Sequence, residues 1–222
     1  SNQSNWYDWG CAHCSEGNYA IIMNGPRGWS GPEYAQGWSF NVPTAEFYNS
    51  FEDGDSRRDA TVLDIEAFAS ATGASYTEGY DHTGYFNNKY IPRAGESGGQ
   101  TELNYLTNFR IIRYSDVLLM AAEAYNRGGI DDGLAQEFLN QVRRRAFGDD
   151  DHDISASGTA LTDAIWEERK FELSLEGHRF FDLVRTGRAS STIAGFVEGK
   201  HEVFPIPQQE VDISGLTQNA GY

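Results

Sequence analysis

Basic residues are scarce in this 222-residue sequence: 17 Lys and Arg stand against 33 Asp and Glu and leave a formal net charge of -16. Proteins bind nucleic acids and anionic membrane surfaces largely by neutralising phosphate groups with Lys and Arg, so this deficit argues against both kinds of partner. The charge allows a neutral or cationic ligand, or a protein partner that offers a basic surface.

Long apolar runs are absent as well. No stretch approaches the roughly 18 consecutive apolar residues of a membrane-spanning helix, and the first residues lack the charged-then-apolar pattern of a signal peptide. The sequence begins at Ser1 without a methionine and enters aromatic, glycine-rich sequence at once. We therefore expect it to be a fragment of a longer protein.

Cysteine is limited to Cys11 and Cys14, which enclose two residues. A zinc site would need a second ligand pair, and a thioredoxin-type motif would need a strand before it and a helix after it. The sequence offers neither, because no other cysteine exists and glycines flank the pair at Gly10 and Gly17. A local disulfide and two free thiols remain as alternatives, and no metal or other cofactor is expected.

Aromatic residues are abundant. They make up 14% of the sequence, and four of the five tryptophans lie among glycines in the first forty residues, where neither helical nor strand periodicity is visible. A sugar ring has apolar C–H faces, so a flat indole or phenol beside Asn, Asp or Arg suits it. On this basis the residues expected to bind ligand are Asn5, Trp6, Tyr7, Asp8, Trp9, Arg27, Trp29 and Tyr34.

A second interpretation of the same rings is structural. Glycine-rich loops need large aromatic side chains to hold them in place as a small satellite core. The sequence leaves binding and packing both open for the Trp6–Trp9 cluster and for the pair of Trp29 and Tyr34.

Upstream of residue 108 regular structure is expected to be sparse. A short helix is predicted over 44–51, directly after Pro43, and a strand is predicted over 60–68. Residues 69–108 are predicted to be loop, with Tyr85 to Ile91 as the one short extended candidate.

Beyond residue 108 the pattern becomes helical. Apolar residues at helical spacing predict helices over about 111–127, 134–147 and 162–176, and the run HRFFDLVRTG predicts a fourth over 178–187. Thr162 is expected to cap the third helix, and a short helix is expected after Pro207. The side chains assigned to the core of the first helix are Tyr114, Leu118, Met120 and Tyr125.

The most charged block contains Glu168, Glu172 and Glu176. A glycosidase needs two carboxyl groups that face each other across the sugar bond. At this spacing the three glutamates share one helix stripe and point the same way, so they cannot enclose a bond. A structural ion-pair network is therefore favoured over catalysis.

Five blocks of the second half carry a family resemblance. FRIIRYSDVLLMAAEAYN (109–126), LNQVRRRA (139–146), IWEERKFELSLEGHRFFDLVRTG (165–187), FPIPQQEV (204–211) and LTQNAGY (216–222) resemble, in order, the carboxyl-terminal signature of SusD/RagB proteins. The segment 37–62 is a weaker match to the part of the family that precedes these blocks, and it favours a packing role for Trp38.

The resemblance implies a mainly α, SusD-like fold with tetratricopeptide-type helix pairs, long irregular aromatic loops and few short strands. Residues 1–108 would form the loop-rich, ligand-binding side and residues 109–222 the helical region, together in one domain. The amino-terminal half of such a protein would be missing. One helix pair over 113–145 would then leave an apolar face without its neighbouring repeats.

The resemblance also implies a function. Such a protein is a non-catalytic subunit, lipid-anchored on the extracellular face of the outer membrane, that passes an oligosaccharide or polysaccharide to a SusC-like TonB-dependent transporter. Peptide capture of the RagB type is the alternative within the family, and a glycoside hydrolase is a third, less favoured hypothesis.

Overall fold

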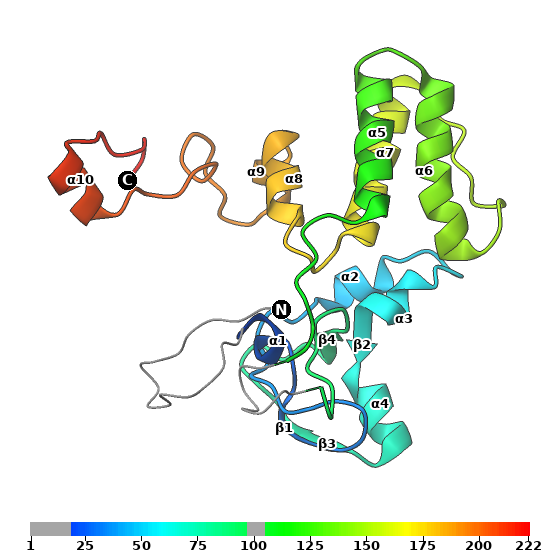
Figure 1. Cartoon of the computed structure of the whole chain (residues 1–222), viewed down its shortest axis with the longest axis vertical. Coiled ribbons are helices and arrows are strands. Elements are labelled where there is room, and N and C mark those ends of the chain that lie inside the picture. Colours follow the sequence, from blue (N-terminus) through cyan, green and yellow to red (C-terminus); the bar gives the residue numbers. More distant parts are fainter. Residues whose placement is uncertain (1–18, 97–104) are drawn as a thin grey trace. The chain divides into compact units, whose positions relative to one another are not determined.

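Figure 1 shows the computed structural model, which describes residues 19–96 and 105–222. The chain divides into two compact units, residues 1–176 and 177–222. The functional boundary expected at residue 108 falls inside the first unit and stays a prediction. Within the described residues, no helix combines the length and the apolar content needed to cross a membrane.

The part of the first unit that precedes residue 97 is built from short elements. The helices are α1 (Tyr19–Met23), α2 (Ala45–Asn49), α3 (Arg57–Thr61) and α4 (Ile65–Thr72), and the strands are β1 (Arg27–Ser30), β2 (Val62–Asp64), β3 (Ser75–Thr77) and β4 (Tyr85–Asn87). β1 pairs antiparallel with β3, and β2 pairs antiparallel with β4. Helix α2 and strand β4 confirm the predicted short helix and extended segment.

The strand predicted over 60–68 is wrong for most of its length. Only Val62–Asp64 is extended, because Asp64 starts a helix: its carboxylate accepts a hydrogen bond from the amide of Ala67 at 2.9 Å. Gly73 then ends α4 in the left-handed conformation, with φ +72°. The partial alternation of apolar and polar residues in this stretch therefore belongs to a three-residue strand followed directly by a capped helix.

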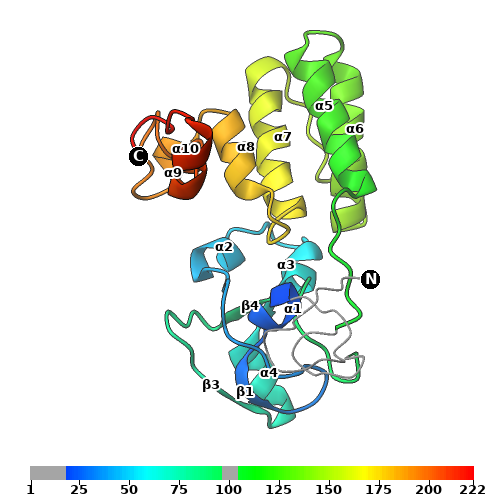
Figure 2. The ribbon, with the colours of Figure 1, turned by 60° about the vertical axis from the view of Figure 1, so that its left-hand side comes forward.

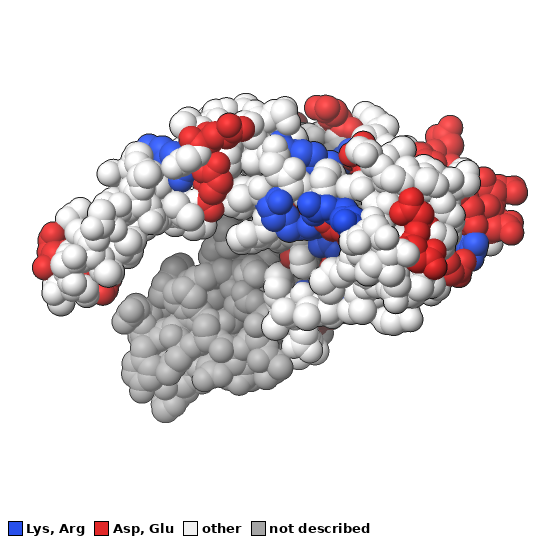
Figure 3. All heavy atoms as spheres, turned by 90° about the horizontal axis from the view of Figure 1, so that it is seen from above, with Lys and Arg blue, Asp and Glu red and all other residues white. Residues whose placement is uncertain are grey.

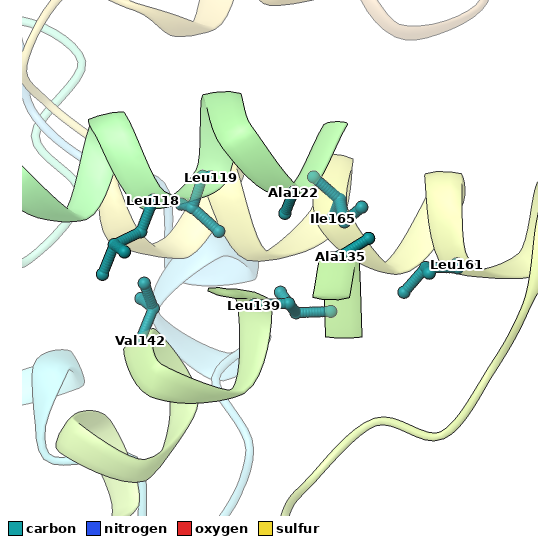
Figure 4. Packing of buried hydrophobic residues seen from close by; sticks show 8 residues of the cluster. All are labelled: Leu118, Leu119, Ala122, Ala135, Leu139, Val142, Leu161 and Ile165. Atoms are coloured by element: carbon teal, nitrogen blue, oxygen red, sulfur yellow. The ribbon is translucent and has the colours of Figure 1, made fainter. Parts of the chain in front are cut away.

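Three longer helices complete the first unit: α5 (Tyr114–Arg127), α6 (Asp132–Phe147) and α7 (Gly158–Glu172). They lie side by side in both ribbon views (Figures 1 and 2). Figure 4 shows the buried side chains between them, which are Leu118, Leu119, Ala122, Ala135, Leu139, Val142, Leu161 and Ile165. The predicted helix pair and its companion are thus confirmed.

Two expectations about these helices are wrong. Helix α7 begins at Gly158, so Thr162 lies inside it, where its hydroxyl donates to the side-chain oxygen of Asn126 at 2.5 Å. Tyr114 and Met120, assigned to the core, are 74% and 44% exposed. Both side chains are therefore largely open to solvent within this chain.

The second unit contains α8 (Arg179–Arg185), α9 (Ala189–Thr192) and α10 (Gln208–Ser214). Helix α10 follows Pro207, as predicted, and Gly215 ends it with φ +64°. Within α8, Asp182 and Arg185 are three residues apart on one helix face and form an ion pair at 2.8 Å.

Candidate functional site

The residues expected to bind ligand fall into two groups. Asn5, Trp6, Tyr7, Asp8 and Trp9, like Cys11 and Cys14, lie outside the described residues. Arg27, Trp29 and Tyr34 are described, and all three belong to the short-element part of the first unit.

Trp29 and Tyr34 are buried, at 9% and 4% exposed. Their rings meet edge to face at 5.9 Å, and both contact Phe68 of α4, at 5.9 and 5.0 Å. They belong to a core cluster that also contains Ile65 and Phe86. This is the arrangement that the packing interpretation expects, and ligand contact by these two residues stays a prediction.

Arg27 is exposed and is held at the start of β1. Its side-chain Nε donates to the carbonyl of Trp38 at 2.7 Å, and its guanidinium lies 5.7 Å from the ring centre of Phe40. Trp38 itself is half-buried against the cluster of Ile21 and Ile22, as expected for a packing residue.

The buried aromatic cluster supports a neighbouring cavity through Arg93. The Arg93 guanidinium lies 5.3 Å from the ring centre of Tyr34 and donates to Glu33 at 2.9 Å and to Asn88 at 3.1 Å. Burial, followed by the charge of Glu33, raises the pKa of the Tyr34 phenol, so this ring is neutral at physiological pH. Tyr34 is buried and helps to hold the side chain of Arg93, which lines the cavity.

The cavity has a volume of about 800 Å³ and lies within the first unit. Lys and Arg outnumber Glu among its lining side chains, although the chain as a whole is strongly acidic. The residues that line it are Arg57, Ala60, Thr61, Asn88, Lys89, Ile91, Arg93, Glu96, Leu106, Thr107, Asn108, Arg110, Arg113, Arg145, Glu172 and Glu176.

Much of this basic lining is neutralised by the three glutamates of the charged block. The side chains of Glu168, Glu172 and Glu176 are only 1–2% exposed. Glu168 pairs with Arg57 of α3 at 2.5 Å and with Arg143 of α6 at 2.9 Å. The glutamates therefore form the structural network that their shared stripe predicted.

Glu172 is the most connected member of the network. It pairs with Arg57 at 3.2 Å, with Arg113 at 2.8 Å and with Arg145 at 2.5 Å. These arginines come from α3, from the residue before α5 and from α6. One buried carboxylate thus joins the short-element part of the unit to its three long helices.

Glu176 lies just past the end of α7, where Leu175 turns the chain with φ +63°. Its carboxylate pairs with Arg113 at 2.7 Å and with Lys89 at 2.6 Å, and the Lys89 ammonium also donates to the carbonyl of Glu172 at 2.8 Å. Burial lowers the pKa of Lys89, and Glu176 opposes that effect.

Ion pairing outweighs burial in setting the pKa of these carboxyl groups. Burial alone would raise the pKa of Glu172, but hydrogen bonds from Arg113 and Ser115 and the charge of Arg145 lower it to about 2. The pKa of Glu176 is also lowered, against burial, by Arg113 and Lys89. Both groups are therefore anionic at neutral pH and cannot act as proton donors in general acid catalysis.

These lowered pKa values predict acid sensitivity. A carboxyl group with a folded pKa below its unfolded value stabilises the fold above the unfolded value, and that contribution is lost as pH falls through the folded value. For Glu172 the window runs from 4.5 down to about 2. We expect the melting temperature to fall as pH is lowered through this window, and the fall to be shallower in Glu172→Gln, as measured by circular dichroism.

The remaining lining residues define what the cavity can bind. The side chains of Arg93, Asn88, Thr107, Asn108 and Arg110 offer hydrogen-bond donors and acceptors to a hydroxyl-rich guest. The Arg110 guanidinium lies 5.5 Å from the ring centre of Tyr90. Sequence reasoning missed this cavity because its walls come from segments far apart in the chain, and only the glutamate stripe at its base had a recognisable spacing.

Known proteins resemble this chain in sequence. A family model described as the SusD family matches residues 2–203. SusD-like protein P2 of Formosa agariphila is 31% identical over 230 residues, which cover 92% of this chain and 45% of that relative.

Solved structures give the same result. A laminarin binding SusD-like protein is 41% identical with a TM-score of 0.83, covering 100% of this chain and 48% of that one. Surface glycan-binding protein A from Bacteroides thetaiotaomicron, in complex with laminarihexaose, is 32% identical with a TM-score of 0.83, covering 99% and 50%. The chain thus spans about half the length of the relatives that it matches.

Proposed function

This chain belongs to the SusD family, and from that premise we propose that it is part of a cell-surface protein that captures a glycan of the laminarin type. The single observation that carries the proposal is the 41% identity, along the whole chain, to a laminarin binding SusD-like protein. The family and the mainly helical fold expected from the sequence are confirmed by the same comparisons.

The charge of the protein supports a neutral ligand. Acidic side chains gather over the loop that follows α6, whereas basic side chains form smaller groups on the same face (Figure 3). A formal net charge of -16 repels polyanions over distances up to the screening length. An uncharged oligosaccharide meets no such barrier.

We place the principal glycan contacts on Trp6, Tyr7 and Trp9, with Asn5 and Asp8 binding hydroxyl groups. Five consecutive residues of these types provide flat apolar surfaces together with hydrogen-bonding groups. Arg27, which is exposed, belongs to the same proposal. The polar cavity wall near Arg110 offers a second place where hydroxyl groups can bind.

Capture without catalysis is part of the proposal. The only carboxylates that sequence analysis raised as catalytic candidates, Glu168, Glu172 and Glu176, are buried in ion pairs and share one stripe. A glycosidase needs one carboxylic acid and one opposing carboxylate. Delivery of the glycan to a SusC-like transporter, and attachment to the extracellular face of the outer membrane through a lipid anchor, complete the proposed role.

Calorimetric titration with laminarihexaose tests the proposal. We expect saturable binding that is about tenfold or more tighter than binding of maltohexaose, which corresponds to about 1.4 kcal/mol of selectivity. Incubation with laminarin should release no new reducing ends.

Other results would contradict particular parts of the proposal. Release of reducing ends would favour the hydrolase hypothesis. Binding of a peptide mixture with no response to laminarihexaose would favour RagB-type peptide capture.

A further inference from the structure

A turn between β1 and α2 holds an aromatic ring at the surface. Phe40 is 47% exposed, whereas Trp38, two residues before it, is half-buried against a core cluster. Isolated exposed rings are common on protein surfaces and indicate nothing by themselves. The backbone and the cation around Phe40 distinguish this ring from the others.

The backbone on both sides of the ring is strained. Ser39 and Asn41 have φ angles of +58° and +53°, left-handed values that residues other than glycine rarely adopt. Strained conformations persist only where neighbouring contacts enforce them, and they are concentrated at ligand-binding and other functional sites. The turn therefore holds Phe40 in a conformation that the rest of the fold must stabilise.

Hydrogen bonds supply the contacts that enforce this turn. The amide of Phe40 donates to the carbonyl of Met23 at 2.8 Å. The Asn41 side chain donates to the side-chain oxygen of Asn24, which is 6% exposed, at 3.0 Å. A ligand that stacks on Phe40 therefore meets a backbone that is already ordered, and little ordering entropy is lost when it binds.

Arg27 of β1 lies beside the ring and is held there by the same turn. Its amide donates to Oγ of Ser39 at 3.0 Å, and its Nε donates to the carbonyl of Trp38 at 2.7 Å. Its guanidinium carbon lies 5.7 Å from the ring centre of Phe40, which is within the range of a cation–π contact. Within residues 19–96 and 105–222, no acceptor contacts the two terminal nitrogens of Arg27, so both can donate to a ligand.

A flat ring beside a planar fork of donors fits a neutral sugar. The C–H face of a sugar can stack on Phe40, and the guanidinium can donate to two neighbouring hydroxyl oxygens. A purely apolar partner would cover these donors without offering acceptors, which costs binding free energy. A phosphate or sulfate group would use the donors but not the ring, and the net charge of -16 opposes its approach.

We propose that Phe40 and Arg27 form a sugar-binding position of their own, in addition to the platform expected over residues 6–9. We call it the Phe40 position. The proposal rests on the glycan capture proposed above and assigns to it a ring that lies outside the residues expected to bind ligand. The ring and the guanidinium bind the same sugar unit, so the loss of either weakens capture of the glycan.

Calorimetric titration of the protein encoded by the complete gene with laminarihexaose tests this position. We expect Phe40→Ala and Phe40→Leu each to weaken affinity about tenfold, because neither side chain offers a flat ring, and Phe40→Tyr to stay within about twofold. Arg27→Lys should weaken affinity about fivefold, because lysine lacks the planar fork of donors. The melting temperatures of these variants should change by about 2 °C or less, because the side chains are exposed.

Tyr80→Ala is the matched control, because it also removes an exposed ring, at 92% exposed. In the described part of the chain, no cation or second ring contacts the Tyr80 side chain. A free ring of this kind must lose side-chain entropy to bind a sugar. Affinity for laminarihexaose should therefore be the same in Tyr80→Ala as in the unmodified protein.

Several results would overturn the Phe40 position. Unchanged affinity in Phe40→Ala together with a large fall in melting temperature, or failure of this variant to fold, would assign the ring to packing. Unchanged affinity and stability with loss of transporter binding would assign it to a protein contact. Full affinity in Phe40→Leu, or an equal loss in Tyr80→Ala, would exclude stacking at this ring. Absence of binding to the unmodified protein would instead contradict the capture of a laminarin-type glycan, and the Phe40 position with it.

Discussion

Replacing Glu172 by glutamine should lower the free energy of unfolding by about 3–5 kcal/mol, because it removes the buried negative charge that three arginines share. The carboxylate contacts Arg57, Arg113 and Arg145 at 3.2 Å or less, and its side chain is 2% exposed. Glutamine keeps nearly the same shape, so the loss reports the charge and not a cavity. Urea unfolding followed by circular dichroism measures it.

Glu167→Gln is the matched control, because it makes the same change in the same helix, α7, five residues before Glu172. Glu167 has a side chain that is 48% exposed, and it pairs only with Lys170, at 2.5 Å, among the contacts of the described residues. Exposed pairs of this kind contribute about 0–1 kcal/mol, so this variant should unfold close to the unmodified chain. Equal, small losses in the two variants would contradict a structural role for the buried network.

The sequence predicted the long helices well because their signals are local. The apolar spacing of Leu118, Leu139 and Val142 identifies a face that must be buried, and Gly148 marks the end of α6 in the left-handed conformation with φ +87°. The same spacing could not say how many faces of α5 are covered within this chain. Tyr114 and Met120 were placed in the core for that reason, although both are exposed to solvent.

Short elements were predicted less completely because long-range pairing sets them. Strand β3 forms by pairing with β1, with Arg27 opposite Thr77. No local alternation of apolar and polar residues predicted it. Strand β2 pairs with β4 in a three-residue register, which is too short for periodicity to separate it from the helix that follows. Sequence patterns carry little information about such contacts.

The sequence predicted which kinds of residue would form the candidate site better than it predicted which of them would meet in space. The stripe of Glu168, Glu172 and Glu176 indicated a network, since residues four apart share a helix face. The arginines that complete it, such as Arg57 and Arg113, are separated from those glutamates by 50 residues or more, and no spacing rule connects them. Composition likewise suggested an aromatic ligand platform but could not separate exposed rings from buried ones.

Tryptophan substitutions should separate these two kinds of ring, and Trp29→Ala is the first of them. Trp29 is buried against Tyr34 and Phe68, so its removal should cost about 3–5 kcal/mol of stability through the cavity that it leaves. Differential scanning calorimetry should show this as a large fall in melting temperature.

Trp6→Ala and Trp9→Ala should give the opposite pattern if these residues form the glycan platform. An aromatic anchor at the centre of a binding site costs about 2 kcal/mol or more on truncation, which weakens affinity about thirtyfold. Their melting temperatures should change little, and Tyr80→Ala, which removes a ring that is 92% exposed, should change neither affinity nor stability. For the variants at Trp6, Trp9, Trp29 and Tyr80, titration with laminarihexaose gives the affinity and calorimetry gives the melting temperature. Unchanged affinity together with a large fall in melting temperature for Trp6→Ala and Trp9→Ala would assign that cluster to the core, as for Trp29.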